Sequence, residues 1–565
     1  MIRNLPERWD LEADVVSIGS GGGGLSAAIT AHDHGASAMV LERTGQVGGV
    51  TAYSLGEIWA PGNHVAAAMG LEDSAESGFR YVRSLAMGYG EERMILNQAV
   101  HAPAMLRYFE EKIGLRLTVI RNCCDYYYGS SNDAVAEGRL LEVEPFPAET
   151  LGEWQERTRI SPHVLYGLNH QDIAEMGGSC NILTWDFTKM GERLAKDERC
   201  LGPGLAAYFV KGALDRGIPM HTGINVEELV GDGERVAGVR ATRGGETIFV
   251  KANKGVVIAV SSFERNPGLA RTIGQQLDPH SIVMPEVDGA HFRLAGPVGG
   301  RIARVPDVTM LGFCVPGEEL QEGVPLWRNI MAYAGLPHTI VVNARGERFG
   351  DESFYRSLYS AVDRLDGATQ THPNFPAWLV FDQQTRDKYP LASLMPGMPI
   401  PEETGITAAT LAELAQKAGI DGGGLAGTVA RFNSYCDAGE DPEFGRGSRP
   451  WGAYMSGDRR HRPHPNFGRL EKGPFYAIRL SRLAGSGIAS AGLLTDNHAR
   501  VQSWNGEPIP GLYAAGNSVA RMDNGAVMQS GMSNARGLTQ GWLAGRHAAG
   551  SPSDLLDREL ARLGG

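Results

Sequence analysis

Apolar residues near the start of the chain form two short runs separated by a segment with helical spacing. Residues 14–18 (DVVSI) and 37–41 (SAMVL) are runs of strand type, and between 25 and 29 apolar residues recur at three- and four-residue intervals. Gly35 stands where that helix should end. The pattern predicts a strand, a helix and a second strand in succession, the opening unit of a parallel sheet.

The turn between the first strand and the helix carries a glycine motif. Gly19, Gly21 and Gly24 stand in G-x-G-x-x-G register, and Glu42 ends the second strand. The glycines allow a tight turn, a close approach to a pyrophosphate and close packing of helix on strand, while the carboxylate accepts hydrogen bonds from a ribose. This context disfavours the alternative, a glycine-rich turn in another α/β protein. A second glycine pair at 48–49 suits a long cofactor and points to FAD.

The middle of the chain changes character several times. Residues 58–121 have polar faces and few turn signals, and we expect surface-exposed helices there. Residues 123–138 (CCDYYYGSSNDAVAEG) predict a loop whose tyrosines either contact a ligand or anchor the loop to its domain. Residues 224–260 predict a β-meander that ends in a buried strand, 255–260, rejoining the nucleotide-binding sheet.

Two further segments belong to a second region. Residues 338–349 predict a hairpin that delivers residues 351–355, and residues 410–435 have amphipathic helical spacing. Near the end, residues 510–517 predict a strand running into a glycine turn, and 531–547 a helix rich in small residues. Such a turn and helix start would again place backbone N–H groups beside a cofactor.

These elements predict an α/β fold with an insertion. We expect a Rossmann-type FAD-binding domain formed by both chain ends, residues 1–287 and 486–565. An α+β catalytic domain, residues 288–485, is expected between them.

Composition excludes several classes of protein. The chain has 565 residues, enough for two or more domains, and a net charge of −12 argues against nucleic acid as a partner. We interpret the basic run at 459–465 as a solvated loop. The six cysteines lack metal-ligand spacing, so we expect reduced thiols and no metal. Without an apolar leader or a membrane-length apolar run, we expect a cytoplasmic protein with no membrane span.

Several stretches spread over nearly the whole chain form a combination more specific than any single motif. They are GSGGGGLSA and LERTGQVGGVTAYSLGEIWAPGN near the start, VVNARGERFGDESFY and RFNSYCDAGEDPEFGRG in the middle, and GPFYA, GLLTD and GLYAAGN toward the end. Together they resemble the flavoprotein family of fumarate reductase and succinate dehydrogenase flavin subunits, and within it the 3-ketosteroid dehydrogenase branch. The resemblance implies FAD as the cofactor, a small-molecule cyclic ketone as substrate and an unidentified electron acceptor.

The resemblance also implies a reaction, the introduction of a carbon–carbon double bond next to a ring ketone. A tyrosinate-like base takes the α proton, donors hold the enolate oxygen, and the β hydride goes to the flavin. The α proton is too weakly acidic to leave unless fixed donors meet the charge that develops on oxygen. The β hydrogen must point at the flavin in a dry pocket, because the gain comes from positioning.

The family's functional positions carry over residue by residue. Tyr126 follows an aspartate in the 123–138 loop, Tyr355 follows an R-F-x-x-E-S stretch, and Gly531 offers a backbone N–H at a helix start. The alternative for Tyr355 is a hydroxyl bonded to the hairpin backbone. The implied cofactor-binding residues are Gly19, Ser20, Gly21, Gly23, Gly24, Glu42, Arg43, Gly48, Gly49, Thr51, Ala52, Ser54, Gly56, Val226, Gly516, Asn517 and Ser533.

The chain departs from the family pattern near Gly531. Steroid 1-dehydrogenases carry a tyrosine that helps to bind the ketone where this chain has Val527. Either Ser530 or Gln529 supplies the second enolate donor beside the Gly531 N–H, or the ketone lies differently. Ser261 and Ser262 replace a usual glycine pair. The chain also lacks the Gly-Glu that ends the soluble fumarate reductase motif, which argues against a C4 dicarboxylate.

Four functions compete at this point. The leading hypothesis is an FAD-dependent desaturase of a cyclohexanone-type ketone, and the second a 3-ketosteroid 1- or 4-dehydrogenase. The third is an ene-reductase of the fumarate reductase type, which would need converging arginines such as Arg293, Arg348 and Arg356. A flavin-bound scaffold without catalysis would require that no cavity open at the flavin's reactive edge.

Overall fold

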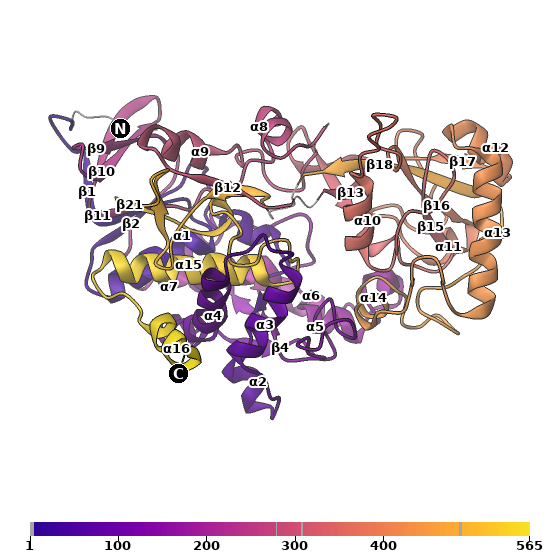
Figure 1. Cartoon of the computed structure of the whole chain (residues 1–565), viewed down its shortest axis with the longest axis horizontal. Coiled ribbons are helices and arrows are strands. Elements are labelled where there is room, and N and C mark those ends of the chain that lie inside the picture. Colours follow the sequence, from indigo (N-terminus) through magenta and orange to yellow (C-terminus); the bar gives the residue numbers. More distant parts are fainter. Residues whose placement is uncertain (1–4, 278–279, 307–308, 485–488, 565) are drawn as a thin grey trace.

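The computed structural model describes residues 5–277, 280–306, 309–484 and 489–564. The molecule is elongated, with a larger lobe that contains both termini and a smaller lobe built from the orange middle of the chain (Figure 1). Two long strands, β13 and β18, run toward the smaller lobe from the region where the lobes meet (Figure 1).

The larger lobe is organised around a sheet to which both ends of the chain contribute. Strand β1 pairs in parallel with its two neighbours, and the strand from the chain's last portion pairs in parallel with β11. The strands of this sheet are β1 (Leu11–Ile18), β2 (Ala38–Leu41), β8 (Met220–His221), β9 (Ile224–Gly231), β10 (Val236–Arg243), β11 (Glu246–Ile258), β20 (Arg500–Gln502) and β21 (Pro508–Ala514). The predicted meander is present, and its last two runs form the single strand β11.

Three helices pack on this sheet and on one another: α1 (Gly22–Asp33), α7 (Leu201–Leu214) and α15 (Met532–Ala548). Glycines allow α1 and α15 to touch. A Cβ on Gly541 would lie 2.2 Å from the carbonyl oxygen of Gly23, and one on Gly545 would lie 2.5 Å from that of Ala27. The two chain ends are therefore joined by backbone contact as well as by the shared sheet.

The segment from 58 to 121 is mostly helical, as predicted, but its expected surface exposure is wrong for the longest helix. Met105, Leu106 and Phe109 of α4 are fully buried in the main core. Other elements of this lobe are β3 (Ile58–Trp59), α2 (His64–Ala68), α3 (Ala75–Leu85), α4 (Glu92–Ile113), β4 (Leu117–Val119), β5 (Leu140–Val143), β6 (Phe146–Pro147), α5 (His170–Glu175), α6 (Thr188–Ala195), β7 (Glu198–Arg199), α8 (Pro267–Thr272) and α16 (Leu555–Gly564).

The smaller lobe contains a second, antiparallel sheet covered by helices. Its strands are β13 (Met310–Gln321), β14 (Val324–Asn329), β15 (Thr339–Asn343), β16 (Ala377–Asp382), β17 (Ile406–Ala408) and β18 (Phe475–Leu483). Its helices are α10 (Tyr355–Val362), α11 (Gln383–Lys388), α12 (Leu411–Ala418), α13 (Gly422–Ala438) and α14 (Pro450–Met455). The predicted hairpin is a tight turn closed by a single bridge between Val342 and Arg348, because β15 pairs along its length with β16 instead.

The exact domain boundaries stay a prediction. Helix α9 (Ala290–Ala295) packs into the core of the larger lobe, and β12 (Ile302–Arg304) pairs with β19 (Ala491–Leu493). We therefore propose that the first FAD-binding segment continues beyond residue 287, through β12.

Candidate active site

One cavity extends from the glycine turn after β1 to the start of α10. Of the predicted site residues, those that line it are Gly19, Ser20, Gly21, Gly23, Glu42, Arg43, Gly49, Thr51, Ser54, Val226, Gly516, Asn517, Ser533, Tyr126, Tyr355 and Gly531. The structure thus brings residues from both chain ends and from the smaller lobe to one hollow. This convergence requires tertiary folding, because Tyr126 and Tyr355 lie on different elements.

The glycine end of the cavity has the form of an anion cradle. Gly19 has φ +98°, and a Cβ there would lie 2.3 Å from the carbonyl oxygen of Ala259. Gly21 caps α1 without a side-chain hydrogen bond, and the first turn of α1 holds no acidic residue. Thr51 accepts the Gly22 N–H at 2.9 Å. The remaining N–H groups and the positive end of the helix suit a pyrophosphate, so the residues present fit FAD.

Glu42 lies at the expected end of β2, and its oxygens already accept protein hydrogen bonds. Oε2 accepts the Ser20 hydroxyl at 2.6 Å, and Oε1 accepts the Thr44 N–H at 2.8 Å. These contacts fix the carboxylate at the cavity wall. Its contact with a ribose stays a prediction.

Four of the predicted cofactor residues, Gly24, Gly48, Ala52 and Gly56, do not line the cavity but support its wall. A Cβ on Gly24 would lie 2.0 Å from the Gly19 oxygen, and one on Gly56 would lie 2.3 Å from the backbone of Leu201. Gly48 donates its N–H to the Ser20 hydroxyl at 3.2 Å, and Ala52 is fully buried. These residues shape the cradle through packing.

Tyr126 is held in place by a buried ion network under its loop. Asp125 accepts hydrogen bonds from Trp59 at 2.8 Å and from Arg139 at 2.9 Å, and Arg139 also binds Asp73. The Tyr126 N–H donates to Gln529 Oε1 at 2.8 Å. In the tyrosine triplet, Tyr127 anchors the loop by packing edge-on against Phe354, and Tyr126 lines the cavity. The contact of Tyr126 with a ligand stays a prediction.

Tyr355 begins α10 and meets Tyr126 across the cavity wall. Its hydroxyl donates to the Tyr126 hydroxyl at 2.9 Å, and the two rings lie edge to face with centroids 6.0 Å apart. The alternative, a hydroxyl bonded to the hairpin backbone, is not what the structure shows. Trp451 packs on both rings, with its ring centroid 4.4 Å from that of Tyr126 and 5.2 Å from that of Tyr355. Burial raises the pKa of both phenols, so both are protonated at rest.

Gly531 lies at the start of α15 with φ +78°, where a Cβ would clash with the Trp59 backbone nitrogen at 2.6 Å. Beside it, Gln529 Oε1 accepts from both Tyr126 and Tyr81, which turns the amide nitrogen away from them. That Nε2 has no acceptor among the described residues. Ser530 is instead bonded to Glu57. Val527 does not line the cavity; it packs in the cluster of Trp59 and Tyr81.

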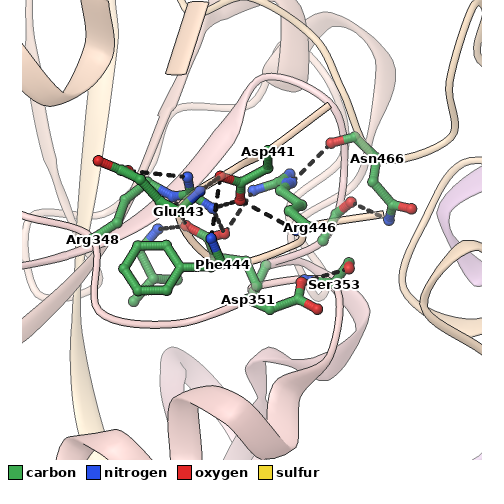
Figure 2. Close-up of polar contacts among 12 residues, drawn as sticks. Arg348, Asp351, Ser353, Asp441, Glu443, Phe444, Arg446 and Asn466 are labelled. Carbon is green, nitrogen blue, oxygen red and sulfur yellow. Dashed lines mark hydrogen bonds and ion pairs between the residues drawn. The ribbon is translucent and has the colours of Figure 1, made fainter. Parts of the chain in front are cut away.

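The three arginines that a dicarboxylate site would need do not converge. Arg348 is held in a buried cluster with Glu352 and Asp441. Figure 2 shows Arg348 beside Asp441. Arg293 donates to the Glu227 and Val226 carbonyls, and Arg356 to that of Ala526. None of the three lines the cavity.

Two residues at the site were not foreseen from the sequence. Glu57 lines the cavity and is bonded to His170, and both side chains are buried. The only signal for Glu57 is an acidic residue between the small and apolar residues of SLGEIW. No local pattern marks His170.

A dinucleotide cradle that opens onto paired buried tyrosines defines a flavoprotein dehydrogenase. The model of the FAD binding domain family matches residues 14–533, and the chain belongs to that family.

The chain is 32% identical to 4-oxocyclohexanecarboxylate 2-dehydrogenase of Sinomonas cyclohexanicum over 97% of this chain and 95% of that protein. It is 30% identical to 3-oxosteroid 1-dehydrogenase of Mycobacterium tuberculosis over 95% of this chain and 98% of that protein. The crystal structure of 3-ketosteroid delta1-dehydrogenase from Sterolibacterium denitrificans is similar, with a TM-score of 0.85 and 28% sequence identity. The match covers 96% of this chain and 100% of that chain. The predicted family, fold class, enzyme class and FAD cofactor are confirmed.

Some other expectations can be compared with the part of the chain that the structure describes. All six cysteines are free thiols. No helix in the described ranges has the length and apolar character needed to cross a bilayer. The basic run is not simply solvated, because Arg459 and Arg460 donate to the carbonyls of Ala174 and Met176 next to α5.

Proposed function

We propose that the protein desaturates an uncharged ring ketone at its α,β position with FAD as the hydride acceptor. The observation that carries this proposal is the 2.9 Å hydrogen bond between Tyr355 and Tyr126, in the same cavity as the glycine cradle. A phenol pair at the reactive end of a flavin site supplies the base that an α proton requires. The geometry supports acid–base chemistry more directly than any other function.

The roles of the protein's own groups follow from their positions. Tyr355 takes the α proton on its oxygen as its own hydroxyl proton passes to Tyr126, which accepts the hydrogen bond between them. The Gly531 N–H and the Gln529 Nε2 amide are the donors for the developing enolate oxygen, in place of the tyrosine that Val527 replaces. FAD, when bound in the glycine cradle, supplies the acceptor for the hydride that leaves the β carbon.

The charges on the cavity wall favour a neutral substrate. Among the described residues, Arg43 is the one arginine or lysine that lines the cavity, and it lies beside Glu42 at the cradle end, bonded to Asp288. The tyrosine end is lined by Met310, Met331 and Met528, together with Glu57. A carboxylate on the ring would lose its hydration there without gaining a cationic partner. We therefore infer a cyclohexanone-type ketone, although one relative is named for a ring that carries a carboxylate.

A 3-ketosteroid is the second candidate substrate. The methionine-lined end favours it, because flexible thioethers adapt to large apolar ligands. The relatives and the solved structure named as steroid dehydrogenases support it as well. An ene-reductase of a dicarboxylate is disfavoured, because no arginine reaches the tyrosine end among the described residues.

The test is anaerobic bleaching of the flavin in the purified holoenzyme. Cyclohexanone, 4-oxocyclohexanecarboxylate and a 3-ketosteroid are each added, and the absorbance of oxidised flavin is followed. We expect a neutral ketone to bleach the flavin with a higher second-order rate constant than the carboxylate. Faster bleaching by the carboxylate would contradict the inferred substrate class, and a flavin that no ketone bleaches would contradict the function.

A further inference from the structure

The two tyrosines are the start of a longer chain of hydrogen bonds that leads away from the cavity. Tyr355 donates to Tyr126 at 2.9 Å, and the Ser530 hydroxyl donates to Glu57 Oε2. Ser530 lies beside the Tyr126 phenol, whose pKa it lowers against the larger effect of burial. Because serine has one hydroxyl hydrogen, which Ser530 donates to Glu57, its oxygen lone pairs are left to accept a proton from the Tyr126 side. The hydrogens of Tyr355 and Ser530 both point along the chain toward the carboxylate.

Glu57 links this chain to an imidazole. His170 Nδ1 lies 2.5 Å from Glu57 Oε1, with side-chain exposures of 8% for His170 and 3% for Glu57. The backbone carbonyl of Glu57 accepts the Asn534 side chain of α15 at 2.9 Å. His170 is therefore slightly more exposed than Glu57, and Glu57 is held between His170 and Ser530.

The burial of the tyrosines creates the need for such a chain. Burial raises the pKa of Tyr126 and Tyr355, so a lone phenolate in this site is unfavourable. Tyr355 is 2% exposed and cannot give its proton directly to water. A base in this position works only if its own proton can move to another group as the α proton arrives.

We propose that Glu57 and His170 form a proton relay that receives, through Ser530 and Tyr126, the proton released by Tyr355. The relay rests on the proposed function. In one turnover the α proton binds the Tyr355 oxygen while the Tyr355 proton moves to Tyr126, that of Tyr126 to Ser530 and that of Ser530 to Glu57. The electron pair of the broken α C–H bond stays on the substrate as the enolate. The Glu57–His170 pair gains one proton, which His170 returns to solvent.

Neighbouring charged groups affect how readily the Glu57–His170 pair takes up and releases a proton. Glu142 accepts the backbone N–H of His170 at 2.5 Å, and burial raises the pKa of Glu142 to about 7. Burial opposes charging of His170, yet Glu57 and Glu142 outweigh it, so the pKa of His170 lies above its ordinary 6.5. The charge of Arg459 lowers the pKa of His170. Tyr454 and the Cys123 thiol are the other titratable groups nearby, and burial raises the pKa of both.

The first experiment removes single links in the flavin-loaded holoenzyme. In Glu57→Gln and Ser530→Ala, we expect ketone-driven flavin bleaching to slow by about 10²-fold, with unchanged flavin content and substrate Kd. Ser530→Thr keeps the hydroxyl and should recover most of the rate. His64→Gln is the matched control, because His64 pairs with Glu110 outside the cavity; it should bleach at the wild-type rate.

The pH profile separates a relay from a merely structural role. The relay accepts a proton when His170 is neutral, so the wild-type bleaching rate should fall as pH drops through the raised pKa of His170. His170→Gln should lower the rate and move the midpoint of this limb. An unmoved midpoint, or wild-type bleaching in both Glu57→Gln and His170→Gln, would overturn the relay.

Tyr355→Phe distinguishes failure of the relay from failure of the proposed function. If it is inactive while the Glu57 and His170 variants are normal, the desaturase chemistry stands and the relay is wrong. If Tyr355→Phe itself bleaches normally, the proposed function fails first, and the relay fails with it.

Discussion

Two buried polar groups lie at opposite ends of the short segment from Arg348 to Tyr355, and they are built differently. At one end Arg348 forms ion pairs with Glu352 at 2.6 Å and with Asp441 at 2.8 Å, and Arg446 lies 3.3 Å from Glu352. Figure 2 shows Arg348, Asp441 and Arg446 of this cluster. At the other end Tyr355 joins the hydroxyl chain that opens on the cavity. The first group is closed by protein partners on nearly every side, and the second ends where a substrate would be.

This difference indicates separate tasks. A buried ion cluster with several mutual hydrogen bonds fixes one arrangement of the loops that supply it, here around residues 348–352 and 441–446. A neutral phenol pair at a cavity contributes little to folding, but its hydroxyls can exchange protons with a ligand. The cluster positions the backbone from which α10 begins, and α10 begins with Tyr355.

The largest effect is expected from breaking the buried ion cluster around Arg348. Arg348→Met leaves the carboxylates of Glu352 and Asp441 buried beside one remaining arginine, so the apparent free energy of unfolding should fall by about 3–5 kcal/mol. Chemical denaturation followed by tryptophan fluorescence measures this change. The double variant Arg348→Met with Glu352→Gln should recover part of the loss, because it removes the stranded charge. A midpoint within error of wild type would show that the cluster does not hold the segment.

The nucleotide end could be predicted from sequence because its geometry is local. Gly19 needs a positive φ, the first turn of α1 follows it directly, and Glu42 ends the next strand, so one stretch of the chain contains the whole arrangement. That both chain ends build one domain also followed from repeated strand and glycine-turn signals, and in the structure β21 pairs with β11.

The tyrosine end could be predicted only through resemblance, and its support could not be predicted at all. Ser530, Glu57 and His170 are distant in the sequence, and no periodicity brings them together. Val527, which stands where the family has a ketone-binding tyrosine, packs in the core, while its neighbour Met528 lines the cavity. The exposure of α4 was misjudged because its polar residues mark only part of its circumference.

The next largest effect is expected from the hydroxyl pair of Tyr355 and Tyr126 at the cavity, and it should change the reaction rate rather than the stability. Tyr355→Phe preserves the ring and its packing on Trp451, and it removes the hydroxyl that takes the α proton. Turnover should fall by about 10²-fold or more, while the free energy of unfolding changes by about 1 kcal/mol or less. Stopped-flow bleaching and denaturation of the same preparation compare the two quantities. A large loss of stability with near-normal bleaching would show that Tyr355 supports the fold and does not transfer the proton.

The smallest effect should come from the exposed edge of the closed group. Glu443 lies 3.9 Å from Arg348 Nη1 with a side chain 33% exposed, so water screens this pair and the long contact is poorly aligned. Glu443→Gln should therefore lower the free energy of unfolding by less than about 1 kcal/mol and leave bleaching unchanged. Added salt should reduce even this small difference, whereas the loss in Arg348→Met should persist because its charges are buried. If Glu443→Gln instead matched Arg348→Met, the cluster would depend on its rim, and the contrast between a closed and an open group would have to be abandoned.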